Sequence, residues 1–262
     1  EHPAVAAMQA AQPLKDFFPG GAGMASELTE WDYRRLRALY FGLISEVDAQ
    51  LGRLFETLKA RGAWEDTVVV FTSDHGEMMG DHHMLGKVGY FPQSFHIPLV
   101  LKIPGYERGV TVSHFTSAVD VFPTLAAVMD VVPEHVPDGA SLWPFAAGEV
   151  PETWRSAALW EFDFRQPLGA QAAAMGLAPE DCVLVTRMER DWLYMASPGL
   201  PPALYDRQAD PGCTRNLADS PHHAAMRLDQ AEALLAARAR LADRTLARCA
   251  VWDWHTVHPS HG

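Results

Sequence analysis

Residues 68–77 read Val68-Val69-Val70-Phe71-Thr72-Ser73-Asp74-His75-Gly76-Glu77, and this stretch decides the fold class of the chain. Its first four residues are β-branched or aromatic, a run too apolar for a strand with one face in water. We therefore predict a central parallel strand over 67–72, covered on both faces. Ligands in open α/β sheets bind where such strands end. The polar residues directly after the strand are thus candidates for a functional site.

The residues that follow the predicted strand suit a metal ion that binds an anion. Adjacent residues of a regular strand point to opposite faces, so Asp74 and His75 can share one ion only if the chain leaves the sheet between them. Gly76 makes that departure easy. An imidazole beside a carboxylate favours manganese, zinc or iron over calcium, which prefers oxygen ligands alone. Lys87, thirteen positions after Asp74, would place a compact cation beside the transferred group or the leaving oxygen.

Three more polar residues lie inside this segment. His82 and His83 are candidates for a hydrogen bond to a metal ligand or for a substrate contact, and the alternative that neither approaches the metal stays open. Glu77 is expected to orient its neighbours rather than to act as a base. For the segment as a whole, the alternative is that the Asp-His pair makes only loop hydrogen bonds and that the lysine is solvated. The combination of strand, pair, glycine and lysine favours the metal site.

The bulk composition argues against several classes of partner. A formal net charge of -12 leaves no basic surplus to replace the counterions of a nucleic acid. No apolar run approaches the ~18 residues of a membrane span, and the first residues show no signal-peptide pattern. The 3 cysteines are an odd number at wide spacing, which fits neither a disulfide framework nor a zinc knuckle. We therefore expect no nucleic-acid and no membrane partner, and a reducing, cytoplasmic location.

The first half of the chain alternates between helix and strand. Thr29 and Asp32 form a capping-box pattern and Gly62 suits a helix C-terminus, so we predict a long helix between them. Its apolar residues recur at spacings of three and four, which predicts one buried face. They are Leu36, Leu39, Tyr40, Leu43, Ile44, Val47, Leu51, Leu54, Phe55 and Leu58. A second strand is predicted over 97–101 and a short helix over 118–129, so the order of elements is that of an α/β fold.

The second half of the chain is predicted to contain short strands rather than a long helix followed by strands. Prolines and glycines interrupt the chain after about residue 133. Short strands are predicted over 157–162, 182–188 and 192–195. A tight charged turn at 189–191 would join the last two, which indicates a small antiparallel sheet. The Ala-, Leu- and Arg-rich segment 222–248 predicts a terminal helix, followed by a tail.

The motif segment resembles a known family. It is similar to the second metal-binding motif of the sulfatase branch of the alkaline phosphatase superfamily, and within that branch most similar to phosphonate monoester hydrolases. The resemblance rests on residues 71–77, 80–87 and 94–100, then continues through 40–48, 119–124, 138–142, 204–206, 210–211 and 216–218. These segments run across nearly the entire chain.

The resemblance implies an alkaline-phosphatase-like sheet flanked by helices, of which this chain holds the C-terminal part, followed by a small antiparallel α+β subdomain. Together with the sequence patterns, it gives three expected divisions: a lead-in loop over 1–28, where no period is sustained, the α/β part over 29–135, and the small sheet with its terminal helix and tail over 136–262. It assigns Asp74 and His75 to one divalent metal ion and Lys87 to catalysis. The substrate would be a small anionic ester, either a sulfate monoester, a phosphonate monoester or a phosphodiester. By analogy, the tail would serve a homo-oligomer, a tetramer in related hydrolases.

The family's nucleophile has no match in this sequence. It is a Cys or Ser followed by Pro two places later and Arg four places later, often converted to formylglycine. Cys182, Cys213 and Cys249 all lack that context, and so does every serine. We therefore expect formylglycine only in a part of the enzyme outside this chain, and expect the chain on its own to be inactive or nearly so.

Two other interpretations stay open at this point. A phosphatase or phosphomutase of the same superfamily would also carry an Asp-His-Gly motif after a strand, but would bring further histidine ligands for a second metal. Residues 94–98 do not resemble such ligands. The other alternative is a truncated domain without catalysis that serves assembly or binding. The absence of the nucleophile motif favours it, whereas the intact metal pair opposes it.

Overall fold

The sequence signals at both ends of the long helix are confirmed. The structure, a computed structural model, describes residues 2–106, 109–165, 168–241, 249–253 and 256–259, the last two ranges without their side chains. Helix α2 (Glu30–Ala60) begins where the Thr29 hydroxyl accepts a hydrogen bond from the backbone of Asp32, whose carboxylate accepts one from the backbone of Thr29. It ends at Ala60, and Gly62 follows the C-cap residue Arg61 with a φ of +68°, which requires a residue that tolerates the left-handed region.

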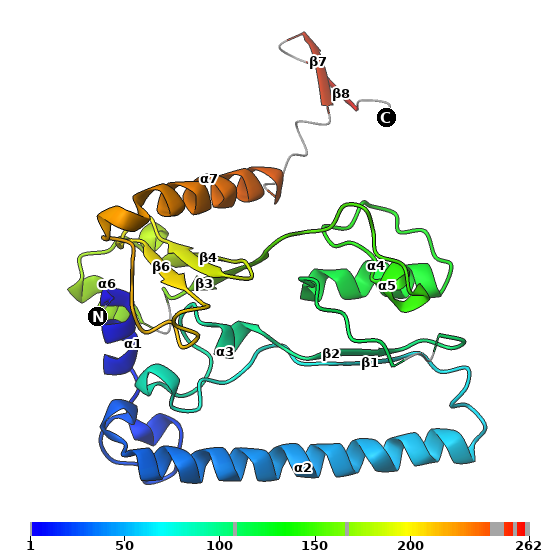
Figure 1. The fold of residues 1–262 in the computed structure, drawn as a ribbon, viewed down its shortest axis with the longest axis horizontal. Helices are drawn as coiled ribbons and strands as arrows, with labels where there is room; N and C mark the ends of the chain where they lie inside the picture. Colours follow the sequence, from blue (N-terminus) through cyan, green and yellow to red (C-terminus); the bar gives the residue numbers. More distant parts are fainter. Residues whose placement is uncertain (1, 107–108, 166–167, 242–248, 254–255, 260–262) are drawn as a thin grey trace.

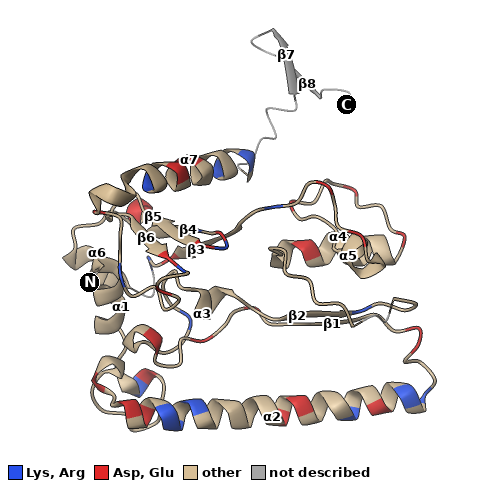
Figure 2. Cartoon of the chain, viewed as in Figure 1, with Lys and Arg blue, Asp and Glu red and all other residues tan. Residues whose placement is uncertain are grey.

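The predicted burial of the apolar face of α2 is wrong for this chain. Tyr33 is the only residue of α2 that is buried. The side chains left exposed include Leu39, Phe41, Leu43, Ile44, Val47 and Leu54. Figure 1 shows why, because α2 runs alongside β1 and β2 as a separate rod over most of its length. Its charged residues of both signs are interspersed (Figure 2), and they form exposed pairs such as Arg34–Glu30.

The strand that carries the site does not lie in a parallel sheet here. β1 (Val69–Thr72) pairs with β2 (Leu99–Lys102) in antiparallel register, with Val69 opposite Lys102. Within the described residues these two strands form a sheet of their own. Phe71 and Val100 are therefore exposed, and the prediction of a parallel strand covered on both faces is wrong. A single antiparallel partner leaves one edge of each strand and much of both faces uncovered.

The predicted antiparallel sheet is confirmed and gains a fourth strand. Its order is β3 (Ala158–Asp163), β4 (Val183–Met188), β5 (Trp192–Ala196) and β6 (Ala203–Asp206). The expected turn joins β4 to β5, with the Glu189 N–H donating to the Trp192 carbonyl oxygen at 2.8 Å. Leu184, Leu193, Met195 and Leu204 of this sheet are fully buried.

One helix lies where the sequence predicted a loop. α1 (Pro3–Ala10) begins at His2, which accepts a hydrogen bond from the Ala4 backbone through Nδ1 and donates one from Nε2 to the Pro201 carbonyl oxygen. Its buried residues join a core cluster with the four-stranded sheet. The loop prediction for 1–28 fails there because an eight-residue helix buried by long-range packing shows no period long enough to recognise.

The same core cluster also includes residues from the motif segment. Met78, Met84, Tyr90 and Phe91 pack with Leu184 and its neighbours in the sheet. The cluster therefore joins residues on both sides of the expected division at 135, a division that stays a prediction. The packing fixes the base of the motif loop against a rigid sheet.

Shorter helices complete the fold. They are α3 (Pro92–Phe95), α4 (Val121–Val128), α5 (Trp143–Ala147) and α6 (Gly169–Ala174). α4 confirms the helix predicted over 118–129, and a 3-10 turn over Ala118–Asp120 leads into it. The terminal helix α7 (Ala224–Leu241) packs on the sheet through Leu234 and Gln230. Residues 242–248 of its predicted extent lie outside the described residues, and the tail contains β7 (Cys249–Asp253) paired with β8 (Thr256–Pro259).

The core contains a tyrosine pair that makes stability depend on alkaline pH. The hydroxyls of Tyr90 and Tyr205 lie 2.8 Å apart, and both side chains are buried. Burial raises the pKa of Tyr205 to about 12, although the hydrogen bond with Tyr90 opposes the shift. The phenol ionises near pH 10 in the unfolded chain, so its contribution is fully present below pH 10 and is lost as the pH rises towards 12.

We expect Tyr205→Phe to flatten the loss of stability above pH 10, by up to about 1.4 kcal/mol per pH unit relative to the parent chain. Urea unfolding at several pH values between 8 and 11.5 measures this slope. Burial also raises the pKa of Cys213 to about 11, so both proteins should still lose some stability from about pH 9. Tyr40→Phe, on the exposed face of α2, is the control. Equal slopes for Tyr205→Phe and the parent would contradict the assignment.

Candidate metal and anion site

The chain leaves the sheet directly after β1, before Asp74 and His75 rather than between them. The Gly76 N–H donates to the Ser94 carbonyl oxygen at 2.8 Å, and the Glu77 N–H donates to that of Gln93 at 2.9 Å. A side chain at Gly76 would place its Cβ 2.0 Å from the Gln93 oxygen. Glycine is required because two backbones approach closely, and this approach turns the Asp74–His75 pair out of the strand.

The two predicted metal ligands lie side by side. His75 Nε2 is 3.5 Å from Asp74 Oδ2. His75 Nδ1–H donates to the Gly76 carbonyl oxygen at 2.8 Å, so in the neutral imidazole Nε2 is the nitrogen that carries the lone pair. The other carboxylate oxygen of Asp74 accepts from the His75 N–H at 3.0 Å. Each side chain is thereby oriented by a backbone group of the residue that follows it.

This donor pair fits a divalent ion. Donors that each bind an ion at about 2.0–2.2 Å can lie no more than about 4.4 Å apart, and the pair meets that condition. Its mixed nitrogen and oxygen character suits manganese, zinc or iron. Within the described parts of the chain, no cluster of three or more His, Cys, Asp or Glu side chains is arranged for a metal. As the predicted ligands, Asp74 and His75 would supply only part of a coordination sphere.

Lys87 lies close enough to influence this pair. Although desolvation raises the pKa of Asp74, the charge of His75, hydrogen bonds from the backbone and the charge of Lys87 together lower it. The Lys87 side chain is exposed, and no hydrogen bond or ion pair to it is found in the described chain. The charge of Lys87 therefore acts on Asp74, whose side chain is exposed like that of Lys87, whereas His75 is half-buried.

The loop between the pair and the lysine is held from several sides. The Glu77 carboxylate accepts hydrogen bonds from the Met79 and Gly86 backbones. Gln12, which is buried, binds both backbone groups of Leu85. Arg37 of α2 binds the Asp81 carboxylate and the Met79 carbonyl oxygen. Neither Gln12 nor Arg37 could be recognised from the sequence, because their partners lie 73 and 44 residues away.

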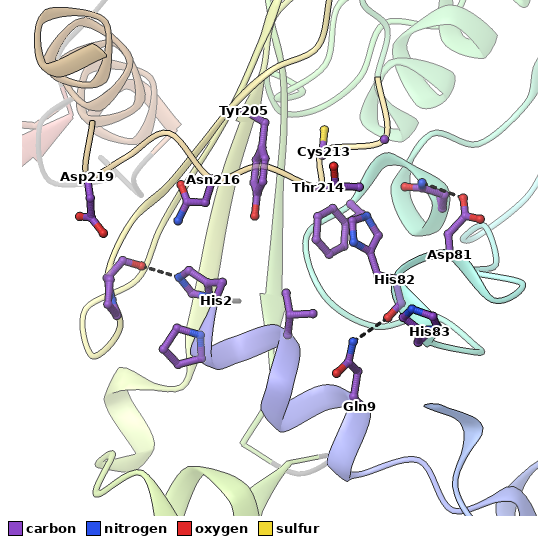
Figure 3. A pocket seen from close by; sticks show the side chains of 16 residues that line it. His2, Gln9, Asp81, His82, His83, Tyr205, Cys213, Thr214, Asn216 and Asp219 are labelled. Carbon is purple, nitrogen blue, oxygen red and sulfur yellow. Dashed lines mark hydrogen bonds between the residues drawn. The ribbon is translucent and has the colours of Figure 1, made fainter. Parts of the chain in front are cut away.

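His82 and His83 face a different cavity. They line a space of about 810 Å³ whose walls do not include Asp74, His75 or Lys87. Figure 3 shows them across this cavity from Asn216 and Asp219. The His82 ring stacks on Phe91 with the ring centres 3.6 Å apart, and burial lowers its pKa although Asp81 opposes the shift. A role for either histidine at the metal stays a prediction.

Comparison with known proteins identifies the family. The family described as Sulfatase matches residues 5–131, and the one described as N-sulphoglucosamine sulphohydrolase, C-terminal, matches residues 80–240. The chain belongs to the sulfatase family of the alkaline phosphatase superfamily. The resemblance drawn from the motif segment is thereby confirmed.

Individual relatives within the sulfatase family point to two kinds of enzyme. The chain is 42% identical over 233 residues to the multifunctional alkaline phosphatase superfamily protein PehA of Trinickia caryophylli. The alignment covers 88% of this chain and 45% of that protein. It is 35% identical to the choline-sulfatase of Rhizobium meliloti (strain 1021), over 74% of this chain and 35% of that protein. The crystal structure of the phosphonate monoester hydrolase of Agrobacterium radiobacter superposes with a TM-score of 0.86 at 44% identity.

Nearly all of this chain matches these sulfatase-family proteins, but only about half or less of each of those proteins is matched. The superposition covers 98% of this chain and 54% of the Agrobacterium chain. The chain spans half or less of the length of the curated relatives reported above. It has the α/β fold of the family, with antiparallel sheets where the structure describes it. No helix among the described residues is both long and apolar enough to cross a membrane.

Proposed function

We propose that this chain is the C-terminal portion of a metal-dependent hydrolase that cleaves a small anionic ester. The observation that carries the proposal is the Asp74–His75 pair, with Nε2 and Oδ2 3.5 Å apart and the imidazole tautomer fixed by Gly76. Such a pair at the end of a strand is built to hold one cation. The family membership supports hydrolysis as the reaction.

Each residue of the site has a separate task in this proposal. Asp74 Oδ2 and His75 Nε2 hold the metal. A divalent ion bound there neutralises an oxygen of the substrate anion and lowers the pKa of an oxygen nucleophile. Lys87 binds the transferred group or stabilises the leaving oxygen with its positive charge. The nucleophile, a formylglycine in many relatives of the family, comes from outside this chain.

Exposed apolar surfaces on α2 and on the β1–β2 sheet support the proposal that the nucleophile lies on a further segment of the protein. Leu39, Leu43 and Val47 on α2, and Phe71 and Val100 on the β1–β2 sheet, are all exposed large apolar residues. Exposed apolar surface of this extent marks an interaction site in a soluble protein. We propose that the part of a sulfatase fold that carries the nucleophile covers these faces, and that the chain without it is inactive.

The substrate is a sulfate monoester, a phosphonate monoester or a phosphodiester, with the phosphorus esters preferred. The preference rests on the 44% identity to a phosphonate monoester hydrolase, against 35% to a choline-sulfatase. A panel of aryl sulfates, phosphonate monoesters and phosphodiesters tests it in the polypeptide that includes the nucleophile. Faster turnover of the sulfates than of both phosphorus esters would contradict the preference.

The other interpretations lead to different results in the same assays. A superfamily phosphatase with a second metal would cleave phosphate monoesters fastest and bind two ions per active site. A domain without catalysis would turn over none of the esters even with the nucleophile part present. The proposal further includes a cytoplasmic location and a homo-oligomer, a tetramer by analogy, in which the tail beyond 248 takes part.

We expect Lys87→Ala to lower the rate constant for hydrolysis about 10²- to 10³-fold with the metal content unchanged, since the lysine acts on charge that develops in the transition state. Steady-state kinetics and elemental analysis of the same preparation measure both quantities. Lys59→Ala, an exposed lysine at the end of α2, is the matched control and should leave the rate unchanged. Loss of metal from Lys87→Ala would contradict the role given to this residue.

A further inference from the structure

We propose that Glu77 is a positioning residue that holds Lys87 in place for the anionic group. The inference rests on the proposed function of Lys87. Glu77 lies two residues after His75, yet none of its contacts is with the metal pair. Its Oε1 accepts from the Gly86 N–H at 2.5 Å and from the Met79 N–H at 3.3 Å. Gly86 is the residue directly before Lys87.

The backbone on both sides of Lys87 is fixed by side chains. Gly86 is held twice, since its carbonyl oxygen also accepts from the Met78 N–H at 2.9 Å. One position earlier, the Leu85 N–H donates to Gln12 Oε1 at 2.9 Å. One position after the lysine, the Val88 carbonyl oxygen accepts from the Ser94 hydroxyl at 3.2 Å. The constrained backbone at Lys87 carries an exposed side chain. Its ammonium group makes no hydrogen bond within the described chain.

Such an arrangement is what a binding lysine needs and a surface lysine does not. A lysine side chain loses conformational entropy when it binds an anion. If the backbone is already fixed, no further backbone entropy is lost on binding. Gly86 has a φ of +73°, a conformation that other residues adopt at a cost, and the Glu77 hydrogen bond helps to hold it. Since the acceptor is a charged carboxylate, this bond is stronger than one between neutral groups.

Glutamine at position 77 offers a conservative test. The second carboxylate oxygen of Glu77 makes no hydrogen bond in the described chain, so the amide nitrogen of a glutamine can take its place while Oε1 still accepts from Gly86 and Met79. We expect Glu77→Ala to speed amide exchange at Gly86 about tenfold or more, and Glu77→Gln to leave it within about threefold. NMR hydrogen exchange on the 262-residue chain measures this without any assay of activity.

The functional test is a double-mutant cycle in the polypeptide that includes the nucleophile. We expect Glu77→Ala to lower kcat about tenfold to a hundredfold with KM and metal content little changed, and Glu77→Gln to restore most of the loss. In a Lys87→Ala background, Glu77→Ala should lower kcat by less than about twofold, because the two residues act as a unit. Glu27→Ala removes a similar carboxylate acceptor from a loop at Met24, and as the matched control it should leave kcat unchanged.

Three results would overturn the inference, and they are distinguishable. Unchanged exchange at Gly86 in Glu77→Ala would refute the contact itself. Effects of Glu77→Ala and Lys87→Ala that multiply in the cycle would show that Glu77 acts by another route, while the role of Lys87 stands. A Lys87→Ala variant with the full rate would refute the proposed function of Lys87, and the positioning role with it.

Discussion

Replacement of either Asp74 or His75 by alanine is expected to lower metal affinity about a hundredfold or more and the rate about 10³-fold or more, in the polypeptide that includes the nucleophile. The expectation follows from the geometry of the pair, because the two side chains offer their donor atoms 3.5 Å apart and neither can replace the other. Loss of a partner that merely orients a ligand already costs about 10- to 100-fold in affinity. Loss of the metal removes several kcal/mol of charge stabilisation from the transition state.

Elemental analysis after dialysis, together with steady-state kinetics, measures both losses. Asp48→Ala on α2 and His222→Ala near the start of α7 are matched controls, since both side chains are exposed and belong to no proposed ligand set. Thermal unfolding of the variants checks that the fold is intact, which is expected because Asp74 is largely exposed. An unchanged metal content in both variants would refute the ligand assignment.

Asp120→Ala is expected to destabilise the fold by about 3–5 kcal/mol, the usual cost of leaving half of a buried ion pair. Asp120 is fully buried, and its carboxylate accepts from both terminal nitrogens of Arg155 at 2.5 and 2.6 Å. It also accepts from the backbone N–H groups of Ser117 and Ala140, at 2.7 and 2.9 Å. The Asp120 side chain therefore joins three segments: the start of α4, the segment before α5, and the segment before β3 that contains Arg155.

Urea unfolding of the 262-residue chain gives the free energy of unfolding for each variant. Arg155→Met should destabilise less in the Asp120→Ala background than alone, because the arginine has by then lost its partner. The exposed pair Lys59–Glu56 on α2 supplies the control, and Glu56→Ala should cost less than about 1 kcal/mol. A loss of less than about 1 kcal/mol for Asp120→Ala would contradict the account of a buried ion pair.

The sequence predicted those elements whose signals are local. The capping box at Thr29 and the charged turn at 189–191 are short-range patterns, and both are present as expected. The helix α1 was missed because its eight residues are too few to show a period, and it is stabilised by packing on strands about 180 residues away. The burial of α2 and the parallel setting of β1 were predicted wrongly. The apolar patterns of α2 and β1 predict surfaces covered by packing, and in the described chain much of both surfaces is exposed.

In the candidate site, too, residues with local signals were predicted and residues that depend on long-range contacts were not. Asp74, His75 and Gly76 were recognisable because they are consecutive and follow a strand, and the structure confirms their proximity. Lys87 was predicted from its place thirteen positions after Asp74 and also from the family motif. Its charge lowers the pKa of Asp74, and its role in catalysis stays a prediction. The residues that hold the loop, Gln12 and Arg37, are invisible in the sequence because their function depends on contacts that only the folded chain creates.

The docking of α1 has a consequence for how the chain folds. His2 donates to the Pro201 carbonyl oxygen across 199 positions of sequence, and the helix it begins shares a core with the strands near that point. The four strands of the sheet pair in chain order, so their ladder can form early. α1 must instead close a loop of about two hundred residues, which slows folding more than it lowers stability. We therefore expect the docking of α1 on the sheet to be a late step in the formation of this core.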